Sequence, residues 1–475
     1  MAEFRKILIA NRGEIAIRVM RAANEMGKST VAIFAEEDKL SLHRFKADEA
    51  YKIGEGLGPV ASYLNIKEII SVAKKAEVDA IHPGYGLLSE KPEFAKECGL
   101  AGIKFIGPTA ESMEKLGNKA NARKIAEKAG VPVIPASNIL PDNPEELVKI
   151  AKNIGFPLML KASWGGGGRG MRLINNIEEV EKNILEGKRE AENAFGNSES
   201  FLERYIKNAR HVEVQILGDK GGNIYHLWER DCSIQRRNQK VIERAPAPYL
   251  NDKQRDVVCE MATAICKQVR YECAGTVEFL MDINTNEFFF IEVNPRIQVE
   301  HTITEEITGI DIVRAQIMLS EGSNLNDAIG KRNQSEIVCN GHAIQCRITT
   351  EDPLNNFIPD YGRITAYRGA TGMGIRLDGG TAYSGAIITR FYDSLLEKVT
   401  AWAPTPEDAI SRMDRALREF RIRGVSTNIS FVENLLKHKK FRDNLYTTKF
   451  IDETPELFQF SERQDRATKL LNYIA

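Results

Sequence analysis

The fold is decided by one stretch, Leu160-Lys161-Ala162-Ser163-Trp164-Gly165-Gly166-Gly167-Gly168-Arg169-Gly170-Met171. Five glycines in six positions separate two strand-like runs, so the loop has little side-chain bulk and its backbone N–H groups can approach an anion closely. Lys161 lies on the preceding predicted strand, where its ammonium group can meet a phosphate. The stretch lacks the GxxxxGK(S/T) pattern of a P-loop. It therefore favours a glycine-rich flap over nucleotide phosphates, with a flexible hairpin tip as the alternative.

A second feature is a predicted hairpin near residues 276–293, with its turn at Asn284-Thr285-Asn286. If the pairing is symmetric about Thr285, Glu278 faces Glu292 directly, with Cβ atoms about 4.5–5.5 Å apart. Two carboxylates so close repel each other unless a cation or a proton lies between them, and Mg²⁺ takes one or two carboxylates plus phosphate oxygens. The hairpin therefore predicts a metal site, which a slipped register or two solvent-facing glutamates would remove.

Two polar segments flank this hairpin in sequence. Residues 229–244 contain five cationic side chains: Arg230, Arg236, Arg237, Lys240 and Arg244. Such a cluster suits a small anion or a phosphate group, and a solvated charged loop is the alternative. After the hairpin, Arg296, Gln298 and Glu300 would share one face if their segment is a strand. A cation, an amide and a base on one face would form a reaction surface, with chance alternation as the alternative.

The chain has seven cysteines and no CxxC pair, which is typical of reduced thiols in a cytosolic protein. Cys232 lies among cations that can activate a thiol, but no histidine base is near it in sequence, so we expect it to be non-catalytic. His82 and His211 lack the spacing of a zinc site. We expect both to serve as hydrogen-bonding groups.

Composition limits the function classes. The 475 residues, 43% hydrophobic and 28% charged, are typical of a globular chain of about three domains. Lys plus Arg total 65 against 66 Asp plus Glu, and this net charge of -1 disfavours a general polyanion binder. No segment approaches the ~20 apolar residues that span a bilayer, and the first apolar run is too short for a secretory signal. We expect a cytoplasmic protein with no nucleic-acid or membrane partner.

The sequence predicts three regions and a tail. Residues 1–115 alternate apolar runs with helical patterns, as in an open parallel, Rossmann-like sheet, although the turn Asn11-Arg12-Gly13-Glu14 lacks the GxGxxG dinucleotide fingerprint. Residues 116–334 form a central α+β region with a lid at about 132–204. Residues 335–455 are mainly β segments before a helix that Thr405-Pro406 begins. Residues 456–475 are expected to be a tail leading to a following domain.

Together these motifs resemble the biotin carboxylase component of biotin-dependent carboxylases, over essentially the whole chain. The resemblance rests on residues 6–16, His82-Pro83-Gly84-Tyr85-Gly86, the glycine tract, residues 229–237 and residues 292–301. Within the family, Asn294-Pro295-Arg296 and Arg237-Asn238-Gln239 are most similar to the biotin carboxylase domain of pyruvate carboxylases. The resemblance implies a Rossmann-like N-terminal (pre-ATP-grasp) domain, an ATP-grasp central domain with a mobile glycine-rich lid, and a mainly β C-terminal domain.

The resemblance also implies site residues. Those implied to hold ATP are Lys119, Lys161, Gly165, Gly166, Gly167, Gly168, Glu203, His211 and Gln235, with Met171, Ile206 and Leu280 in the adenine slot and Asn238, at a position that is often His, near the ribose. The implied Mg²⁺ or Mn²⁺ ligands are Glu278, Glu292 and Asn294. Bicarbonate would lie against Lys240, Arg296, Gln298 and Val299, Glu300 would deprotonate it, and Arg347 and Tyr85 would face the biotin. Lys240, Arg296, Glu300 and Arg347 are the implied catalytic residues.

The implied activity is ATP-dependent carboxylation of carrier-bound biotin by bicarbonate through carboxyphosphate, the first half-reaction of a pyruvate carboxylase. The chain has no Met-Lys-Met biotin acceptor, so a biotin carboxyl carrier domain and a carboxyltransferase domain are implied partners, in the same or a separate chain. A homodimer or part of a homotetramer is the implied assembly. Alternatives are the biotin carboxylase subunit of an acetyl-CoA, other acyl-CoA or 2-oxoacid carboxylase, a different ATP-grasp ligase, and a silent nucleotide-binding regulatory domain.

Overall fold

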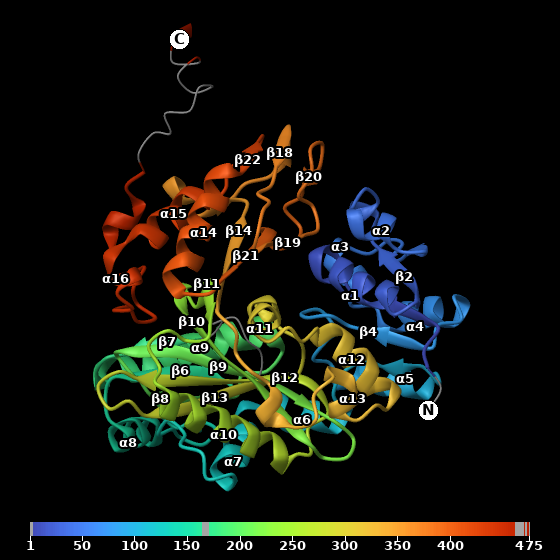
Figure 1. The fold of residues 1–475 in the computed structure, drawn as a ribbon. Coiled ribbons are helices and arrows are strands. Elements are labelled where there is room, and N and C mark those ends of the chain that lie inside the picture. Colours follow the sequence, from blue (N-terminus) through green and yellow to red (C-terminus); the bar gives the residue numbers. More distant parts are fainter. Residues whose placement is uncertain (1–2, 164–170, 461–469, 471–472, 475) are drawn as a thin grey trace.

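The structure, a computed structural model, describes residues 3–163, 171–460, 470 and 473–474. Figure 1 shows an N-terminal region in blue, a central region from teal to yellow, and a C-terminal region in orange and red. The predicted flap residues Gly165, Gly166, Gly167 and Gly168 lie outside the described residues, so their role stays a prediction. None of the helices in the described part of the chain combines the length and apolar character that crossing a bilayer requires.

The N-terminal region contains a parallel five-stranded sheet in the order β3-β2-β1-β4-β5. Its strands are β1 (Lys6–Ile9), β2 (Ser29–Phe34), β3 (Glu49–Lys52), β4 (Ala80–His82) and β5 (Lys104–Phe105). Its helices are α1 (Gly13–Glu25), α2 (Leu42–Lys46), α3 (Pro59–Tyr63), α4 (Ile66–Lys75) and α5 (Pro92–Leu100). The predicted open parallel sheet is confirmed. The edge strand β3 escapes prediction because its sequence, Glu-Ala-Tyr-Lys, has no apolar run.

The turns that follow β1 and β4 meet at one edge of this sheet, because the two strands are parallel neighbours. The side-chain Nδ2 of Asn11 donates to the carbonyls of Pro83 at 2.6 Å and Tyr85 at 2.8 Å. Gly84 permits this approach, since its φ is +63° and a Cβ there would lie 2.9 Å from Asn11 Nδ2. As a result, the Tyr85 hydroxyl donates a hydrogen bond to Glu14, which lies in the first turn of α1.

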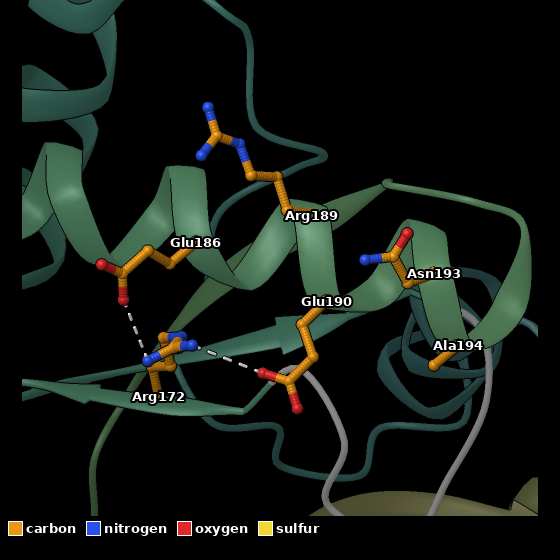
Figure 2. Close-up of a pocket in the computed structure, with 6 residues that line it drawn as sticks. All are labelled: Arg172, Glu186, Arg189, Glu190, Asn193 and Ala194. Atoms are coloured by element: carbon orange, nitrogen blue, oxygen red, sulfur yellow. Dashed lines mark hydrogen bonds and ion pairs between the residues drawn. The ribbon is translucent and has the colours of Figure 1, made fainter.

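A small sheet in the order β7-β6-β8 lies in the region predicted as a lid. Its elements are β6 (Leu158–Ala162), β7 (Arg172–Ile174) and β8 (Ser200–Arg204), with α8 (Pro144–Ile154) and α9 (Val180–Phe195) beside them. A pocket of about 600 Å³ lies beside α9, and in it Arg172 on β7 lies 3.2 Å from Glu186 and 3.5 Å from Glu190. Figure 2 shows Arg172 pointing toward these two glutamates. These ion pairs fasten β7 to α9.

An eight-stranded sheet forms the centre of the molecule, in the order β13-β12-β9-β10-β11-β14-β21-β19. Its strands are β9 (Ala209–Gly218), β10 (Ile224–Arg236), β11 (Gln239–Ala245), β12 (Cys273–Asp282), β13 (Phe288–Asn294), β14 (His342–Thr349), β19 (Ile375–Gly379) and β21 (Leu395–Ala403). Because β11 pairs with β14, one sheet runs through the predicted boundary at residues 334–335. Short strands in the C-terminal region are β15 (Glu351–Asp352), β16 (Ile358–Pro359), β17 (Gly362–Arg363), β18 (Ala366–Arg368), β20 (Ile387–Ile388) and β22 (Arg421–Arg423).

Helices pack around this sheet. They are α6 (Ala110–Gly117), α7 (Lys119–Lys128), α10 (Asp252–Gln268), α11 (His301–Thr308), α12 (Ile312–Glu321), α13 (Leu325–Ile329), α14 (Pro406–Glu419), α15 (Ile429–Lys437) and α16 (Lys439–Arg442). Asn118 separates α6 from α7, and its side chain accepts from the Asn121 N–H and thereby caps α7. Thr405 caps α14 in the same way, through the N–H of Asp408.

A buried carboxyl in the C-terminal region provides a test by pH. Glu397 on β21 accepts a 2.7 Å hydrogen bond from the Tyr367 hydroxyl, and burial raises its pKa from 4.5 to about 7. Because of this raised pKa, the folded protein binds the Glu397 proton more tightly than the unfolded chain does. The free energy of unfolding includes this contribution below the ordinary pKa and loses it as the pH rises through about 7. We therefore expect Glu397→Gln to gain stability relative to wild type between pH 5 and pH 8, by up to about 3 kcal/mol.

Melting temperatures measured across this pH range by circular dichroism would check the expectation. Glu453→Gln, at an exposed position, is the matched control. A difference between Glu397→Gln and wild type that does not change with pH would contradict it.

Candidate active site

A cleft of about 870 Å³ lies where the three regions meet. Every predicted site residue that the structure describes lines it: Tyr85, Lys119, Lys161, Met171, Glu203, Ile206, His211, Gln235, Asn238, Lys240, Glu278, Leu280, Glu292, Asn294, Arg296, Gln298, Val299, Glu300 and Arg347. Tyr85 comes from the N-terminal region and Arg347 from β14, whereas most of the others lie on the central sheet or the loop after it. The fold therefore brings together residues that are up to 262 positions apart in the sequence.

The two hairpin glutamates face each other as predicted, with Glu278 paired with Glu292. The reason differs from the assumed symmetry. Near the turn, Met281 pairs with Phe288 and Phe279 with Phe290, a register that would place Ile291 opposite Glu278. A β-bulge at this point inserts one residue and restores the predicted pairing. The register-slip alternative is therefore wrong.

The cleft contains paired lysines and carboxylates at the end near the lid. Lys119 Nζ lies 3.2 Å from Glu292 Oε2, and Lys161 forms an ion pair with Glu203. The nearby Glu292 raises the pKa of Lys119 despite burial. Met171, Ile206 and Leu280 line the same cleft with apolar side chains. Cations beside an apolar wall suit the phosphates and the base of a nucleotide.

Lys240 is the centre of a buried charge cluster. Its Nζ lies 2.6 Å from Glu213, 2.7 Å from Glu300 and 3.1 Å from Glu278. Although burial alone would lower the pKa of Lys240, the three carboxylates raise it well above its usual value. His211 Nε2 lies 2.9 Å from Glu278, and His211 Nδ1 lies 2.7 Å from the Gln235 amide. The lysine therefore stays charged and links Glu278 to Glu300.

Glu300 is held between two cations. Its carboxylate lies 2.7 Å from Lys240 Nζ and 3.1 Å from an Arg347 nitrogen, and only 2% of its surface is exposed. Burial alone would raise the pKa of Glu300, but Lys240, Arg347 and Arg230 lower it. Glu300 is therefore an ionised carboxylate at neutral pH. It is positioned in the cleft by contacts from both the central and the C-terminal regions.

The segment from residue 295 to 300 is a loop, so the predicted strand face is wrong. The three side chains nevertheless converge on the cleft. Arg296 donates to Asn294 Oδ1 at 3.0 Å, and Gln298 donates to Glu278 Oε1 at 2.9 Å. The side chains are gathered by hydrogen bonds to the hairpin, a cause that periodicity alone cannot reveal.

The basic segment 229–244 forms strands β10 and β11, so the solvated-loop alternative is wrong. Arg230 and Arg244 are buried, and Arg230 donates to Glu213 Oε1 at 2.6 Å. They therefore support the sheet from within, whereas Lys240 forms an ion pair with Glu300 directly. Asn238 has φ of +63° in the turn between the strands, a conformation that asparagine adopts more readily than most residues.

Several functional candidates are missed by sequence reasoning. Glu213 is buried between Arg230 and Lys240, and Glu243 on β11 accepts from Arg347 Nε at 2.6 Å. Glu213 lies two residues after His211 on β9 and so faces the same side, which is the one signal that the sequence offers. Glu243 has no such signal, because its partner lies on β14.

The cysteine and histidine expectations agree with the geometry. Cys232 is buried with its Sγ 3.9 Å from Glu300, and burial raises its pKa well above the usual value. A protonated thiol of this kind is a poor nucleophile. His82 accepts from the Gly84 N–H at 3.0 Å and lies 3.2 Å from Gln316, as a hydrogen-bonding group does. All seven cysteines are free.

Three family models match consecutive parts of the chain. They are the biotin carboxylase N-terminal domain at residues 3–113, the ATP-binding domain of the carbamoyl-phosphate synthase L chain at 118–328, and the biotin carboxylase C-terminal domain at 345–453. The two flanking models favour a biotin carboxylase over the other ATP-grasp ligases. They also confirm the predicted fold class, with an ATP-binding domain between N- and C-terminal domains.

Whole proteins and solved structures agree with these models. Pyruvate carboxylase of Bacillus subtilis is 54% identical over 470 residues, which are 99% of this chain and 41% of that protein. A structure of Rhizobium etli pyruvate carboxylase T882A with acetyl coenzyme A is 63% identical, with a TM-score of 0.95, over 100% of this chain and 42% of that one. The chain thus spans about two fifths of these relatives.

A relative of matching length is also known. The biotin carboxylase domain of Hydrogenobacter thermophilus 2-oxoglutarate carboxylase, solved as a dimer with MgADP, ADP and bicarbonate, is 45% identical with a TM-score of 0.93. The match covers 97% of this chain and 100% of that domain. The identity extends over the full length of a biotin carboxylase domain, and the N- and C-terminal family models match the parts of the chain on either side of the ATP-binding model. The chain belongs to the biotin carboxylase family.

Proposed function

We propose that the chain carboxylates biotin with bicarbonate at the expense of ATP, as the first half-reaction of a pyruvate carboxylase. The observation that carries this proposal is the convergence, in one cleft, of the facing Glu278 and Glu292 with the Lys240–Glu300–Arg347 cluster. A nucleotide and bicarbonate are bound by the Hydrogenobacter thermophilus domain, which supports the same ligands here.

The nucleotide end of the cleft fits MgATP. Glu278, Glu292 and the Asn294 amide offer the all-oxygen donor set that Mg²⁺ prefers. When bound there, Mg²⁺ or Mn²⁺ offsets the charge of the phosphate oxygens. Lys119 and Lys161 would replace their present carboxylate partners with phosphate oxygens. We assign ATP to this set together with Glu203, His211 and Gln235, and the adenine to Met171, Ile206 and Leu280, with Asn238 near the ribose.

The other end of the cleft fits bicarbonate. Lys240, Arg296, Gln298 and the backbone of Val299 surround the space beside Glu300. The cations that lower the pKa of Glu300 also favour the more highly charged form of bound bicarbonate, so the proton can pass to this carboxylate. A bicarbonate oxygen then attacks the γ-phosphorus, the bond from that phosphorus to the ADP oxygen breaks, and carboxyphosphate forms.

Biotin is assigned to the wall formed by Arg347 and Tyr85. Carboxyphosphate would split into CO₂ and phosphate, the phosphate would take the ureido proton, and the ureido nitrogen would attack CO₂. Arg347 would stabilise the negative charge on the ureido oxygen. Its guanidinium already bridges Glu243 and Glu300, so its position is fixed before biotin arrives.

Glu243 therefore provides a test of the biotin end. We expect Glu243→Gln to lower the biotin-stimulated rate about tenfold or more and to raise KM for biotin, because Arg347 loses a charged partner at 2.6 Å. Steady-state kinetics with free biotin would measure both. Glu55→Gln, at an exposed position, is the control. An unchanged KM for biotin in a folded Glu243→Gln protein would contradict this role for Glu243.

The proposal also includes the partner domains, the assembly and the domain boundaries of the chain. Biotin would be delivered by a biotin carboxyl carrier domain and passed to a carboxyltransferase domain, and a homodimer is supported by the dimer of the Hydrogenobacter thermophilus domain. A pyruvate carboxylase is favoured because the Bacillus subtilis and Rhizobium etli relatives have that name. Domains at residues 1–115, 116–334 and 335–455 are supported by the three family-model matches.

The rate at which ATP is converted to ADP and phosphate would test the proposed carboxylase activity. In CO₂-free buffer with saturating Mg²⁺, we expect the purified chain to release ADP and phosphate only after bicarbonate is added, and faster with free biotin. Turnover without bicarbonate dependence would favour another ligase activity. No turnover under any condition would favour a silent nucleotide-binding domain.

A further inference from the structure

The loop before α11 exposes its carbonyls to three buried or half-buried side chains. Arg296 donates to the Ile297 carbonyl at 3.2 Å, His301 Nδ1 lies 2.7 Å from the Gln298 carbonyl, and Lys398 Nζ lies 3.0 Å from the Val299 carbonyl. Three consecutive peptide groups are therefore fixed by side chains. His301 and Lys398 have no part in the site assignments above.

The two peptide groups that precede Glu300 are held through their carbonyls by His301 and Lys398. In a planar trans peptide the N–H points away from the C=O, so a carbonyl held by His301 directs the Val299 N–H to the opposite side. Val299 lines the cleft. Within the described part of the chain, this N–H donates no hydrogen bond. It is therefore available to an anion in the cleft.

The His301 ring is suited to this task by its surroundings. It is fully buried, and burial together with neighbouring cations holds its pKa well below the usual value. A neutral ring that donates to a carbonyl through Nδ1 has its lone pair on Nε2. Among the residues that the structure describes, Nε2 has no hydrogen-bond partner, and it lies 3.8 Å from Glu305. One tautomer therefore fits, and it is the one that fixes the Gln298 carbonyl.

Lys398 connects the loop to the opposite wall of the cleft. Its fully buried Nζ also lies 3.1 Å from Glu14, and Glu14 accepts the hydrogen bond of the Tyr85 hydroxyl. A single ammonium group on β21 thus contacts the Val299 carbonyl on one side and Glu14, the hydrogen-bond partner of Tyr85, on the other. The helix α11, which begins at His301, also packs against β21, which bears Lys398.

We propose that His301 and Lys398 are positioning residues of the bicarbonate pocket, an inference that rests on the function proposed above. His301 aims the Val299 N–H into the pocket, and Lys398 fixes the next peptide group, which contains the Val299 carbonyl and the Glu300 N–H. Neither side chain touches the substrate. Each acts through a carbonyl, so its loss would weaken the binding of the anion more than that of the nucleotide.

The test uses two independent sets of variants. We expect His301→Leu to raise KM for bicarbonate about tenfold or more with KM for MgATP changed less than twofold, and His301→Asn, whose amide can donate to the same carbonyl, to recover most of the loss. Lys398→Met is made together with Glu14→Gln, because Lys398→Met alone would leave a buried carboxylate unpaired. This double variant should show the same KM split. Lys253→Met, at an exposed position, is the control.

Bicarbonate binding is measured separately from turnover, by the rise in melting temperature with bicarbonate at constant ionic strength. Wild type that binds bicarbonate without turnover would overturn the proposed function alone, and weaker binding by the variants would then still support the positioning roles. Folded variants with unchanged bicarbonate affinity, or an equal rise in KM for both substrates, would overturn the positioning roles. Wild type with neither binding nor turnover would overturn both.

Discussion

Replacement of Glu300 by Gln is expected to lower bicarbonate-dependent ATP cleavage by about 10²–10⁴-fold, the range that a positioned general base contributes. The amide keeps the size of the side chain but cannot accept the bicarbonate proton. It also leaves Lys240 with two of its three carboxylate partners, so the lysine stays charged and in place.

The measurement is the rate of ADP release at saturating bicarbonate, with Glu260→Gln at an exposed position as the control. Nucleotide affinity, measured by titration with ADP, should change little because Glu300 lies at the bicarbonate end of the cleft. A Glu300→Gln protein that retains the wild-type rate would show that another group takes the proton.

The second large effect is expected at the facing carboxylates. Glu292→Gln should raise the Mg²⁺ concentration needed for half-maximal turnover and lower the maximal rate by about 10²–10³-fold, because a ligand is lost and charge on the phosphates is less well offset. Lys119 would lose its ion pair with Glu292 at 3.2 Å and would lie nearer the phosphates without a competitor.

Turnover measured against Mg²⁺ and then against Mn²⁺ would check this effect. The control is Glu287→Gln, a change at an exposed position near the turn of the same hairpin. If the metal requirement of Glu292→Gln equals that of wild type, Glu292 is not a ligand.

Local patterns were enough to predict much of the fold, whereas most residues of the cleft were predicted from the family resemblance. Apolar runs and helical spacing predict β1, α1, β2 and β4, because these elements have buried apolar faces. The glutamate pair is also predicted, but its register depends on a bulge that has no sequence signal. The convergence of Arg296, Gln298 and Glu300 is predicted for the wrong reason, since a loop rather than a strand presents them.

Long-range contacts account for what local patterns cannot predict. Glu14 meets Tyr85 because β1 and β4 are neighbours, and Glu243 meets Arg347 because β11 pairs with β14. Neither pairing can be read from spacing, since the partners are 71 and 104 residues apart. Arg230 and Lys240 belong to one basic run in the sequence, but Arg230 is fully buried in the sheet whereas Lys240 lines the cleft.

The pairing of β11 with β14 has a mechanical consequence. Glu243 and Arg347 lie on adjacent strands of one hydrogen-bonded sheet, and that sheet continues to the strand that bears Glu278. The spacing between Arg347 on β14 and Glu278 on β12 is thus set by strand register, and it cannot lengthen without breaking backbone hydrogen bonds. The small β7-β6-β8 sheet is separate from the eight-stranded sheet, so a displacement of the small sheet would leave the spacing of Arg347 and Glu278 unchanged.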